Sequence, residues 1–176
     1  MQDKKIEIRL ATISDAALIA LLGQITFSDT FGHYFRDRND LMNYFERTFS
    51  VAKIEQSIRK STTRYWLAFV DKLPVGYAKL KLNSPSPFLD MKAVCQLQKI
   101  YVLKDFHSMK IGFHLQKELL ETAASLNHQN IWLSVLDENE KAIKFYQNNG
   151  FLPVGSHDFQ IGRENFTFTV LSKALH

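Results

Sequence analysis

Residues 97–112, LQKIYVLKDFHSMKIG, join a run that is typical of a β-strand to the start of a helix. The helix is predicted over residues 110–126, because apolar side chains recur there at four-residue steps along one face. Those side chains are Ile111, Leu115, Leu119 and Ala123. A helix that begins just after a strand often binds a phosphate, since its first N–H groups and its dipole favour an anion. Gly112 is the single glycine of the stretch, so the backbone has little of the clearance that glycine gives.

The rest of the chain alternates between strands and helices. Strands are predicted at residues 6–10, 64–70, 75–82, 95–103, 131–135, 151–161 and 166–171. Helices are predicted after residue 12, twice within 26–60, at 110–126 and at 139–148, the last ended by Gly150. Turns at 71–74 and 162–165 join two hairpins, and the prolines of 83–90 place that segment in a loop. This order predicts an α/β domain with a mixed sheet and helices on both faces.

Capping residues mark the helix starts in the first third of the chain. Thr12 and Asp15 resemble a capping box before an apolar helix. The segment 26–60 is rich in aromatic residues and predicts two short helices, with Asp40 and Ser50 as their N-caps.

The composition limits the class of protein. The chain has 176 residues, of which 45% are hydrophobic, and this is enough for one sizeable core and predicts a single domain over residues 1–176. The 22 basic and 18 acidic residues are interspersed, so the net charge of +4 favours small anionic ligands without forming a basic stripe. We therefore expect no nucleic-acid partner.

The sequence gives no reason to expect a disulfide, a metal or a membrane partner. Cys95 is the single cysteine, so no intrachain disulfide can form. The six histidines lack the spacing of metal ligands, and no metal is expected. No apolar run approaches the roughly 18 residues of a membrane span, and the N-terminal MQDKKIEIRL lacks the apolar region of a secretion signal. We expect a cytoplasmic protein.

Two segments carry a family resemblance, namely residues 97–112 and residues 130–151, NIWLSVLDENEKAIKFYQNNGF. The more specific half is the pattern NxxAxxFYxxxGF, formed by Asn139, Ala142, Phe145, Tyr146, Gly150 and Phe151. Together the segments resemble the GNAT superfamily of N-acetyltransferases, whose order of elements agrees with nearly the whole chain. The stretches ITFSDTFG, VGYAKLKLN and QLQKIYVLK are similar to the bacterial spermidine/spermine N-acetyltransferase branch.

The resemblance implies both a fold and a reaction. The fold is a GNAT-like single domain, whose mostly antiparallel sheet of about seven strands is splayed between its fourth and fifth strands. The reaction is transfer of an acetyl group from acetyl-CoA to a primary amine, by direct attack in a ternary complex. A polyamine such as spermidine or spermine is the small-molecule acceptor that the branch implies.

By this resemblance, the pyrophosphate of coenzyme A binds where the helix begins. The family pattern is QxxGxG or RxxGxA, and the matching positions are His107, Ser108, Met109, Lys110, Ile111 and Gly112. The first is His in place of Gln or Arg, and the fourth is Lys in place of Gly. Because backbone N–H groups hold the anion, Lys110 in a helical conformation still serves, and its ammonium adds charge. Taken alone, these residues favour an ordinary strand-to-helix loop with a solvated lysine, and it is the pattern at 139–151 that favours the phosphate site.

The resemblance also assigns the strand before the loop. In the family, the pantetheine arm of coenzyme A inserts beside this strand as an added strand. Ile100 and Val102 match the positions whose main chain binds the arm, with Tyr101 between them. The N–H of Val102 matches the group that stabilises the thioester oxygen as charge develops there. From the residues alone, LQKIYV is equally an ordinary central strand.

Tyr146 matches the general acid of the family. The departing thiolate needs a proton, and a phenol with a pKa of about 10 stays protonated at neutral pH and can donate one. The alternative is that Phe145 and Tyr146 are both core aromatic residues at helical spacing. Asn139 matches a position that contacts the cofactor, and it equally fits as a helix N-cap.

The sequence assigns no general base. Many family members carry Glu at the strand position occupied here by Gln98, and an amide cannot accept a proton. Either a water chain links the amine to a more distant group, such as His33, Asp29 or Glu46, or the free amine binds directly. Asp29, His33, Tyr34 and Gln98 are the candidates for binding the acceptor.

Two other functions and the oligomeric state stay open. A protein or peptide N-acetyltransferase uses the same cofactor site with a wider acceptor groove. A non-catalytic acyl-CoA-binding regulatory module would fit the altered loop and Gln98. An exposed strand near the C-terminus would let two subunits pair as a homodimer.

Overall fold

The computed structural model describes residues 4–175, and its strands form one seven-stranded sheet. The strands are β1 (Ile6–Leu10), β2 (Thr63–Val70), β3 (Leu73–Lys81), β4 (Val94–Val102), β5 (Asn130–Leu136), β6 (Leu152–Ile161) and β7 (Glu164–Ala174). Their order across the sheet is β1-β2-β3-β4-β5-β7-β6, with β4 and β5 parallel and the other neighbours antiparallel. The predicted mixed and mostly antiparallel sheet is confirmed.

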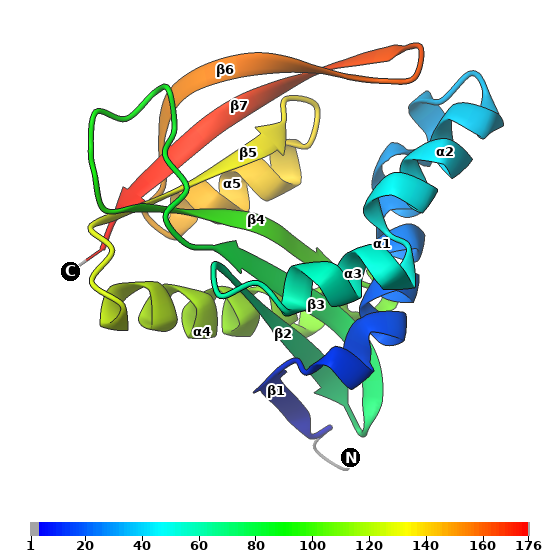
Figure 1. Ribbon diagram of the computed structural model, residues 1–176, viewed down its shortest axis with the longest axis horizontal. Helices are drawn as coiled ribbons and strands as arrows, with labels where there is room; N and C mark the ends of the chain where they lie inside the picture. The colour runs from blue at the N-terminus through cyan, green and yellow to red at the C-terminus, as the bar shows by residue number, and fades with distance from the viewer. Residues whose placement is uncertain (1–3, 176) are drawn as a thin grey trace.

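Helices cover both faces of this sheet (Figure 1). They are α1 (Ala16–Phe31), α2 (Arg38–Thr48), α3 (Val51–Ile58), α4 (Ile111–Ser125) and α5 (Glu140–Asn148), with the 3₁₀ helices η1 (Ile13–Asp15), η2 (Gly32–Tyr34) and η3 (Lys104–Met109). Helices α1 to α3 lie on one face, and α4 and α5 lie on the other. Within residues 4–175, none of the helices has the length and apolar character needed to cross a membrane.

The central strands are apolar on both sides because both faces are covered. In β2, Trp66 and Ala68 belong to the core under α4 and α5, whereas Tyr65 and Leu67 belong to the core under α1 and α3. This division follows from the two-residue period of a strand, which turns successive side chains to opposite faces. The same alternation holds in β4, where Ile100 and Val102 pack on the core under α4 and α5 and Tyr101 packs on the core under α1 and α3.

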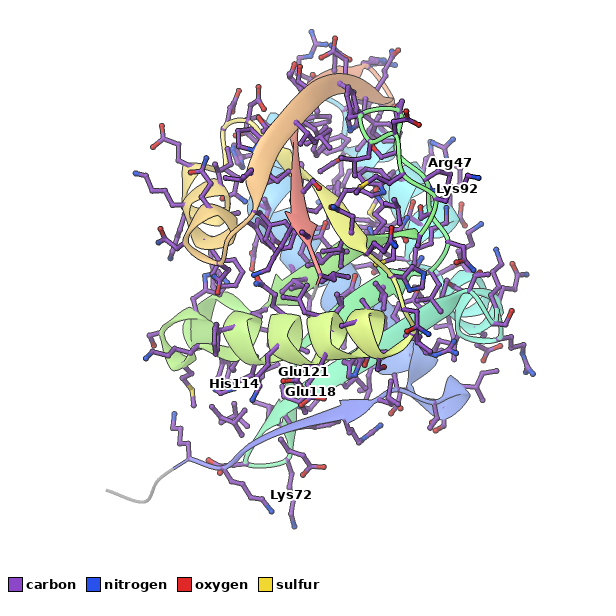
Figure 2. The ribbon with its side chains drawn as sticks, turned by 90° about the vertical axis from the view of Figure 1, so that its left-hand side faces the viewer. Arg47, Lys72, Lys92, His114, Glu118 and Glu121 are labelled. Carbon is purple, nitrogen blue, oxygen red and sulfur yellow. The ribbon has the colours of Figure 1, made fainter. Side chains whose placement is uncertain are left out.

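Helix α4 has the amphipathic pattern that the sequence predicts. Its apolar positions are fully buried against the sheet, namely Ile111, Leu115, Leu119 and Ala123. Its outer side carries His114, Glu118 and Glu121, which lie together in Figure 2 and are exposed. Burial of the apolar side anchors the first turn of α4 beside the end of β4.

Strands β4 and β5 separate soon after they begin. They are paired only where Val94 meets Asn130, Cys95 meets Ile131 and Gln96 meets Trp132. Beyond these pairs, residues 97–102 of β4 do not pair with residues 133–136 of β5. The predicted splay between the fourth and fifth strands is therefore confirmed.

One cap predicted for the first third of the chain was wrong. The two short helices predicted within residues 26–60 are present as α2 and α3, and residues 26–31 continue α1. The N-cap of α2 is Asp37, whose carboxylate accepts from the N–H of Asn39 at 2.9 Å, and not Asp40. Asp40 instead accepts from the N–H of Arg163 in the distant turn between β6 and β7, at 3.0 Å. That contact between distant segments has no local sequence signal.

The other predicted caps are confirmed. The N–H of Thr12 donates to the Asp15 carboxylate at 2.7 Å, and the N–H of Lys53 donates to Ser50 Oγ at 3.3 Å. At the other end of the chain, β6 lies at the edge of the sheet and β7 lies inside it. Pairing of two subunits through that edge stays a prediction.

Candidate active site

A cleft of about 450 Å³ lies between the separated parts of β4 and β5. Its walls are residues 97–102 of β4 and 133–136 of β5. Residues of η3 and the first turn of α4 line one end, residues of α1 line another part, and residues of α5 and Phe168 of β7 complete the lining. Segments that are distant in the sequence therefore meet around one cavity.

The hydrogen-bond alternation between β3 and β4 decides which backbone groups face this cleft. The N–H of Leu103 donates to the carbonyl of Val75 at 2.8 Å, so the backbone of Leu103, and two residues earlier that of Tyr101, points to β3. The N–H groups of Ile100 and Val102 therefore point the opposite way, where β5 has moved apart. Of the three predicted strand positions, Ile100 and Val102 present main-chain donors to the cleft, and Tyr101 lines it with its side chain.

Strand β5 offers donors from the opposite wall. The N–H of Asp137 donates to the carbonyl of Thr167 on β7 at 3.0 Å, and the same alternation turns the N–H groups of Ser134 and Leu136 towards β4. The cleft thus lies between two open strand edges. An extended chain that contains amide groups can bind to such edges in the manner of an added strand.

Gln98 forms a β-bulge at the narrow end of the cleft. Lys79 pairs with Lys99 and Leu80 pairs with Leu97, which leaves Gln98 without a partner on β3. The Oε1 atom of Gln98 is buried and accepts no hydrogen bond from the described residues. Because buried acceptors are normally satisfied, this oxygen is suited to a donor of a bound molecule.

The opposite end of the cleft is cationic. It is lined by Lys104, His107, Lys110 and Lys141. The N–H of His114 donates to the carbonyl of Lys110 at 3.2 Å, so the N–H groups before it in α4 have no helical partner. Free donors, a helix dipole and several cations together fit a pyrophosphate.

Lys110 is not helical, contrary to the prediction for this position. It has φ 57° and ψ 22°, in the left-handed region, and it is the N-cap of α4. The family pattern has glycine at this position, and glycine adopts this conformation at little cost. The chain keeps that backbone shape with a lysine, which costs about 1 kcal/mol and adds a positive charge.

The six predicted loop positions have different surroundings. His107, Lys110 and Gly112 line the cleft. The side chain of Ile111 is fully buried beneath the sheet, so it can contribute only its N–H. Ser108 and Met109 belong to η3 and are not part of the lining.

Helix α5 brings Tyr146 and Asn139 to the cleft. The N–H of Phe151 donates to the carbonyl of Tyr146 at 3.1 Å and Gly150 has φ 85°, a helix end that holds Tyr146 in place. Burial raises the pKa of the Tyr146 phenol, which therefore keeps its proton at neutral pH. Asn139 is an N-cap, since its Oδ1 accepts from the N–H of Ala142 at 3.1 Å, and it also lines the cleft.

The sequence did not point to Lys99, which also lines the cleft. Its Nζ lies 4.9 Å from the ring centroid of Phe49 and 5.6 Å from that of Tyr101. Burial lowers the pKa of Lys99 to about 8. Among residues 4–175, no carboxylate forms an ion pair with this ammonium. A lysine in a strand rich in polar residues carries no signal that separates it from a surface lysine.

The predicted acceptor residues do not all meet. Asp29 and Gln98 line the cleft, and Asp29 does so from an exposed position on α1. Tyr34 lines a second pocket of about 190 Å³. His33 is exposed and packs on the ring of Tyr34, with 3.9 Å between the centroids, and Glu46 is exposed on α2. Neither His33 nor Glu46 lines either cavity.

The second pocket is acidic and adjoins the cleft, because Leu136 lines both. The pKa of the Tyr34 phenol is raised, chiefly by its hydrogen bond with the Glu138 carboxylate. Three carboxylates contribute to this pocket, namely Asp137, Glu138 and Glu164. The pocket therefore suits a positively charged group beside the cleft.

A sheet that is splayed in this way, with donors on both strand edges and cations at one end, suits an enzyme that binds an elongated anionic ligand containing amide groups. A profile of the acetyltransferase (GNAT) family matches residues 27–151. The chain belongs to this family and is an N-acetyltransferase that uses acetyl-CoA. The superfamily prediction is thereby confirmed.

Individual proteins are similar to this chain in sequence or in fold. The chain is 28% identical over 153 residues to an uncharacterized N-acetyltransferase encoded in the pepI 3′ region of Lactobacillus delbrueckii subsp. lactis, covering 85% of this chain and 86% of the relative. The fold is similar to the crystal structure of PaiA N-acetyltransferase from Thermoplasma acidophilum in complex with coenzyme A, with a TM-score of 0.76, 20% identity and coverage of 97% and 99%. It is also similar to NAA60 from Arabidopsis thaliana in complex with a bisubstrate analogue, with a TM-score of 0.73, 15% identity and coverage of 97% and 98%.

Proposed function

We propose that this N-acetyltransferase acetylates a primary amine in a ternary complex, with acetyl-CoA along β4 and the amine entering from the side of α1. The observation that carries the proposal is the pair of open strand edges. Ile100 and Val102 direct N–H groups into the cleft, and the lining continues without a break from the cationic loop to Asp29. Acetyl-CoA supplies the acyl group as a thioester.

Each group of the chain has a separate task in this proposal. The N–H of Val102 donates to the thioester oxygen, where negative charge develops during attack. The N–H of Ile100 and the Oε1 of Gln98 orient the amide arm, and Lys110 with the first turn of α4 holds the pyrophosphate. Tyr146 gives its proton to the departing sulfur, because its phenol is protonated and lines the cleft.

For the acceptor we propose a polyamine such as spermidine or spermine. The reacting amine would lie in the cleft, and a distant ammonium would lie in the acidic pocket beyond Leu136. Phe31 and Phe168 line the cleft and would pack against the methylene groups between the two. The carboxylate of Glu138 supports this arrangement, since it lies at the pocket without an ion pair among residues 4–175.

Lys99 favours a second candidate, an amine without further positive charge, such as the N-terminus of a peptide. Its unpaired ammonium lies within the same cleft and repels a polycation more than a monoamine. The two candidates share the cofactor site and differ in the charge of the acceptor, so one screen separates them.

The test is a mass-spectrometric screen of polyamines, monoamines and peptides with isotope-labelled acetyl-CoA. A polyamine acceptor predicts that spermidine or spermine is labelled most rapidly, and that Glu138→Gln raises the KM for spermidine but not for a monoamine. Glu140→Gln is the matched control, because Glu140 is exposed and lines neither cavity. Rapid labelling of peptides alone would favour the second candidate. Binding of acetyl-CoA without transfer to any amine would support a regulatory module and overturn the proposal.

A further inference from the structure

Ser134 and His157 form a hydrogen-bonded pair at the wall of the cleft. The Oγ of Ser134 on β5 lies 2.9 Å from the Nε2 of His157 on β6. Ser134 lines the cleft, and both side chains are partly buried. The pair therefore connects the interior of the cleft with the edge strand of the sheet.

The sheet geometry brings this pair together across an intervening strand. Leu136 pairs with Phe168 on β7, and Phe168 pairs with His157 on β6, so these side chains lie on one face. Ser134 is two residues from Leu136 and shares that face. The imidazole lies parallel to the Phe168 ring, with 5.5 Å between the centroids and 13° between the planes. Phe168 thereby supports the imidazole beside Ser134.

The second ring nitrogen of His157 indicates which atom carries the proton. The Nδ1 of His157 lies 3.4 Å from the carbonyl oxygen of Asp158. A carbonyl can only accept, so Nδ1 carries the hydrogen in the neutral ring and Nε2 is the acceptor. The hydroxyl of Ser134 then donates to Nε2, and its oxygen is left to accept a hydrogen bond from a molecule in the cleft.

From this arrangement we propose that Ser134 and His157 relay a proton away from the acceptor amine, and this inference rests on the proposed amine acetylation. The acceptor ammonium donates to Ser134 Oγ, the Ser134 hydroxyl proton moves to His157 Nε2, and the free amine attacks the thioester carbon. The new C–N bond replaces the C–S bond. Tyr146 gives its proton to the departing sulfur, and the second proton lost by the nitrogen restores the Tyr146 phenol. The net result is one proton released, which leaves from His157 at the sheet edge. Gln98 cannot take this role, because an amide does not accept a proton.

Few charges surround the imidazole. The elements packed against it bring Phe168 from β7 and Ser134 from β5. The carboxylates of the neighbouring Asp158 and of Asp137 accept hydrogen bonds from Thr167 and Thr169. Lys99 and Asp29 line the same cleft from β4 and α1. A proton reaching His157 is thus not held by an ion pair among residues 4–175.

The first test uses nitrogen NMR of the ligand-free protein with ¹⁵N-labelled histidine. We expect the neutral ring of His157 to be the Nδ1–H tautomer, and we expect a shift of its Nε2 signal in Ser134→Ala. Ser156→Ala is the matched control, because Ser156 is exposed on the same strand as His157. A wild-type ring protonated at Nε2 would overturn the inference, because that nitrogen would donate to Ser134 and could not take its proton.

The second test compares pH profiles of kcat/KM for the best acceptor of the amine screen. His157→Gln and Ser134→Ala should each lower kcat/KM at pH 7 by about 100-fold. The loss should shrink as the pH approaches the pKa of the acceptor amine, because the free amine then needs no base. Acetyl-CoA affinity should stay unchanged, and His114→Gln on the outer side of α4 should behave as wild type (Figure 2).

The outcomes separate this inference from the proposed function. A wild-type protein that acetylates no amine would remove the proposed function itself. In another outcome, the wild type acetylates an amine while the two variants keep its pH profile, or lose activity equally at every pH. Either result would exclude the proton relay and leave the proposed function standing.

Discussion

The Nε2 of His107 lies 2.8 Å from the carbonyl oxygen of Val102. Because a carbonyl only accepts, Nε2 carries the hydrogen and donates it. This contact occupies the Val102 carbonyl, which points to the same side as the Val102 N–H. The end of β4 therefore presents a donor to the cleft, and the same bond ties η3 to the strand. His107 has a structural role as well as a place in the cleft lining.

Replacing His107 by Ala should weaken coenzyme A binding by roughly fivefold, because the loss of one hydrogen bond costs about 1 kcal/mol and frees the loop. His107→Gln keeps a donor and should retain most of the affinity. Isothermal titration calorimetry of both variants measures the difference. Equal affinities for His107→Ala and the wild type would show that the contact does not shape the site.

Lys110 combines an unfavourable backbone conformation with a useful charge, and two substitutions separate these effects. Lys110→Gly should raise the free energy of unfolding in urea by about 1 kcal/mol, because glycine accepts a positive φ. The same variant should bind coenzyme A more weakly, because the ammonium is lost.

Lys110→Glu should weaken acetyl-CoA binding far more than binding of the acceptor. Lys117→Glu is the charge-matched control, since Lys117 is exposed on α4 and lines neither cavity. Titrations of each ligand into both variants give the comparison. Equal weakening of cofactor and acceptor by Lys110→Glu would contradict the assignment of this loop to the pyrophosphate.

Tyr146→Phe should lower kcat by about 100-fold with little change in acetyl-CoA affinity. The substitution removes the proton donor and keeps the ring that packs on Phe151, at 5.6 Å between centroids. Tyr65→Phe is the matched control, because its hydroxyl bonds to Ser57 under α3 and lies outside the cleft. An unaltered kcat for Tyr146→Phe would exclude Tyr146 from the proposed mechanism.

The local patterns of the sequence predicted the strands and helices of the sheet, whereas the splay was implied by the family resemblance. A strand shows its period of two within a few residues, and the pattern from Asn139 to Phe151 lies within one helix and its end. Tyr146 could be found in this way, because the glycine-ended helix that carries it is a local structure. The Asn139 cap was predicted from the same stretch.

Features that depend on pairing between distant strands could not be predicted. The Gln98 bulge exists because of the register between β3 and β4. The contact of Ser134 with His157 requires β7 to lie between β5 and β6 in the sheet. No local pattern in β6 or β7 indicates that β7, and not β6, pairs with β5. Lys110 shows a different limit, since a lysine gives no sign of a left-handed backbone. In each case the neighbours in space, and not those in sequence, decide the outcome.

Replacing Lys99 by Met should lower the KM of a cationic acceptor by roughly tenfold below pH 8. Burial lowers the pKa of Lys99 to about 8, so the ammonium is present below that pH and is lost as the pH rises through it. While present, it repels an incoming ammonium by about 1.5 kcal/mol at a separation of roughly 10 Å. It also favours the free amine, since a nearby like charge lowers the pKa of the acceptor.

The KM of the acceptor, measured against pH in wild type and Lys99→Met, tests this effect. The two curves should differ most near pH 7 and should meet above about pH 9, where Lys99 is neutral in the wild type. Lys81→Met is the control, because Lys81 is an exposed lysine two residues beyond Lys79, the partner of Lys99 on β3. A ratio of KM values that is constant with pH would show that the charge of Lys99 does not act on the acceptor. The substitution would then report only a change of shape beside Tyr101.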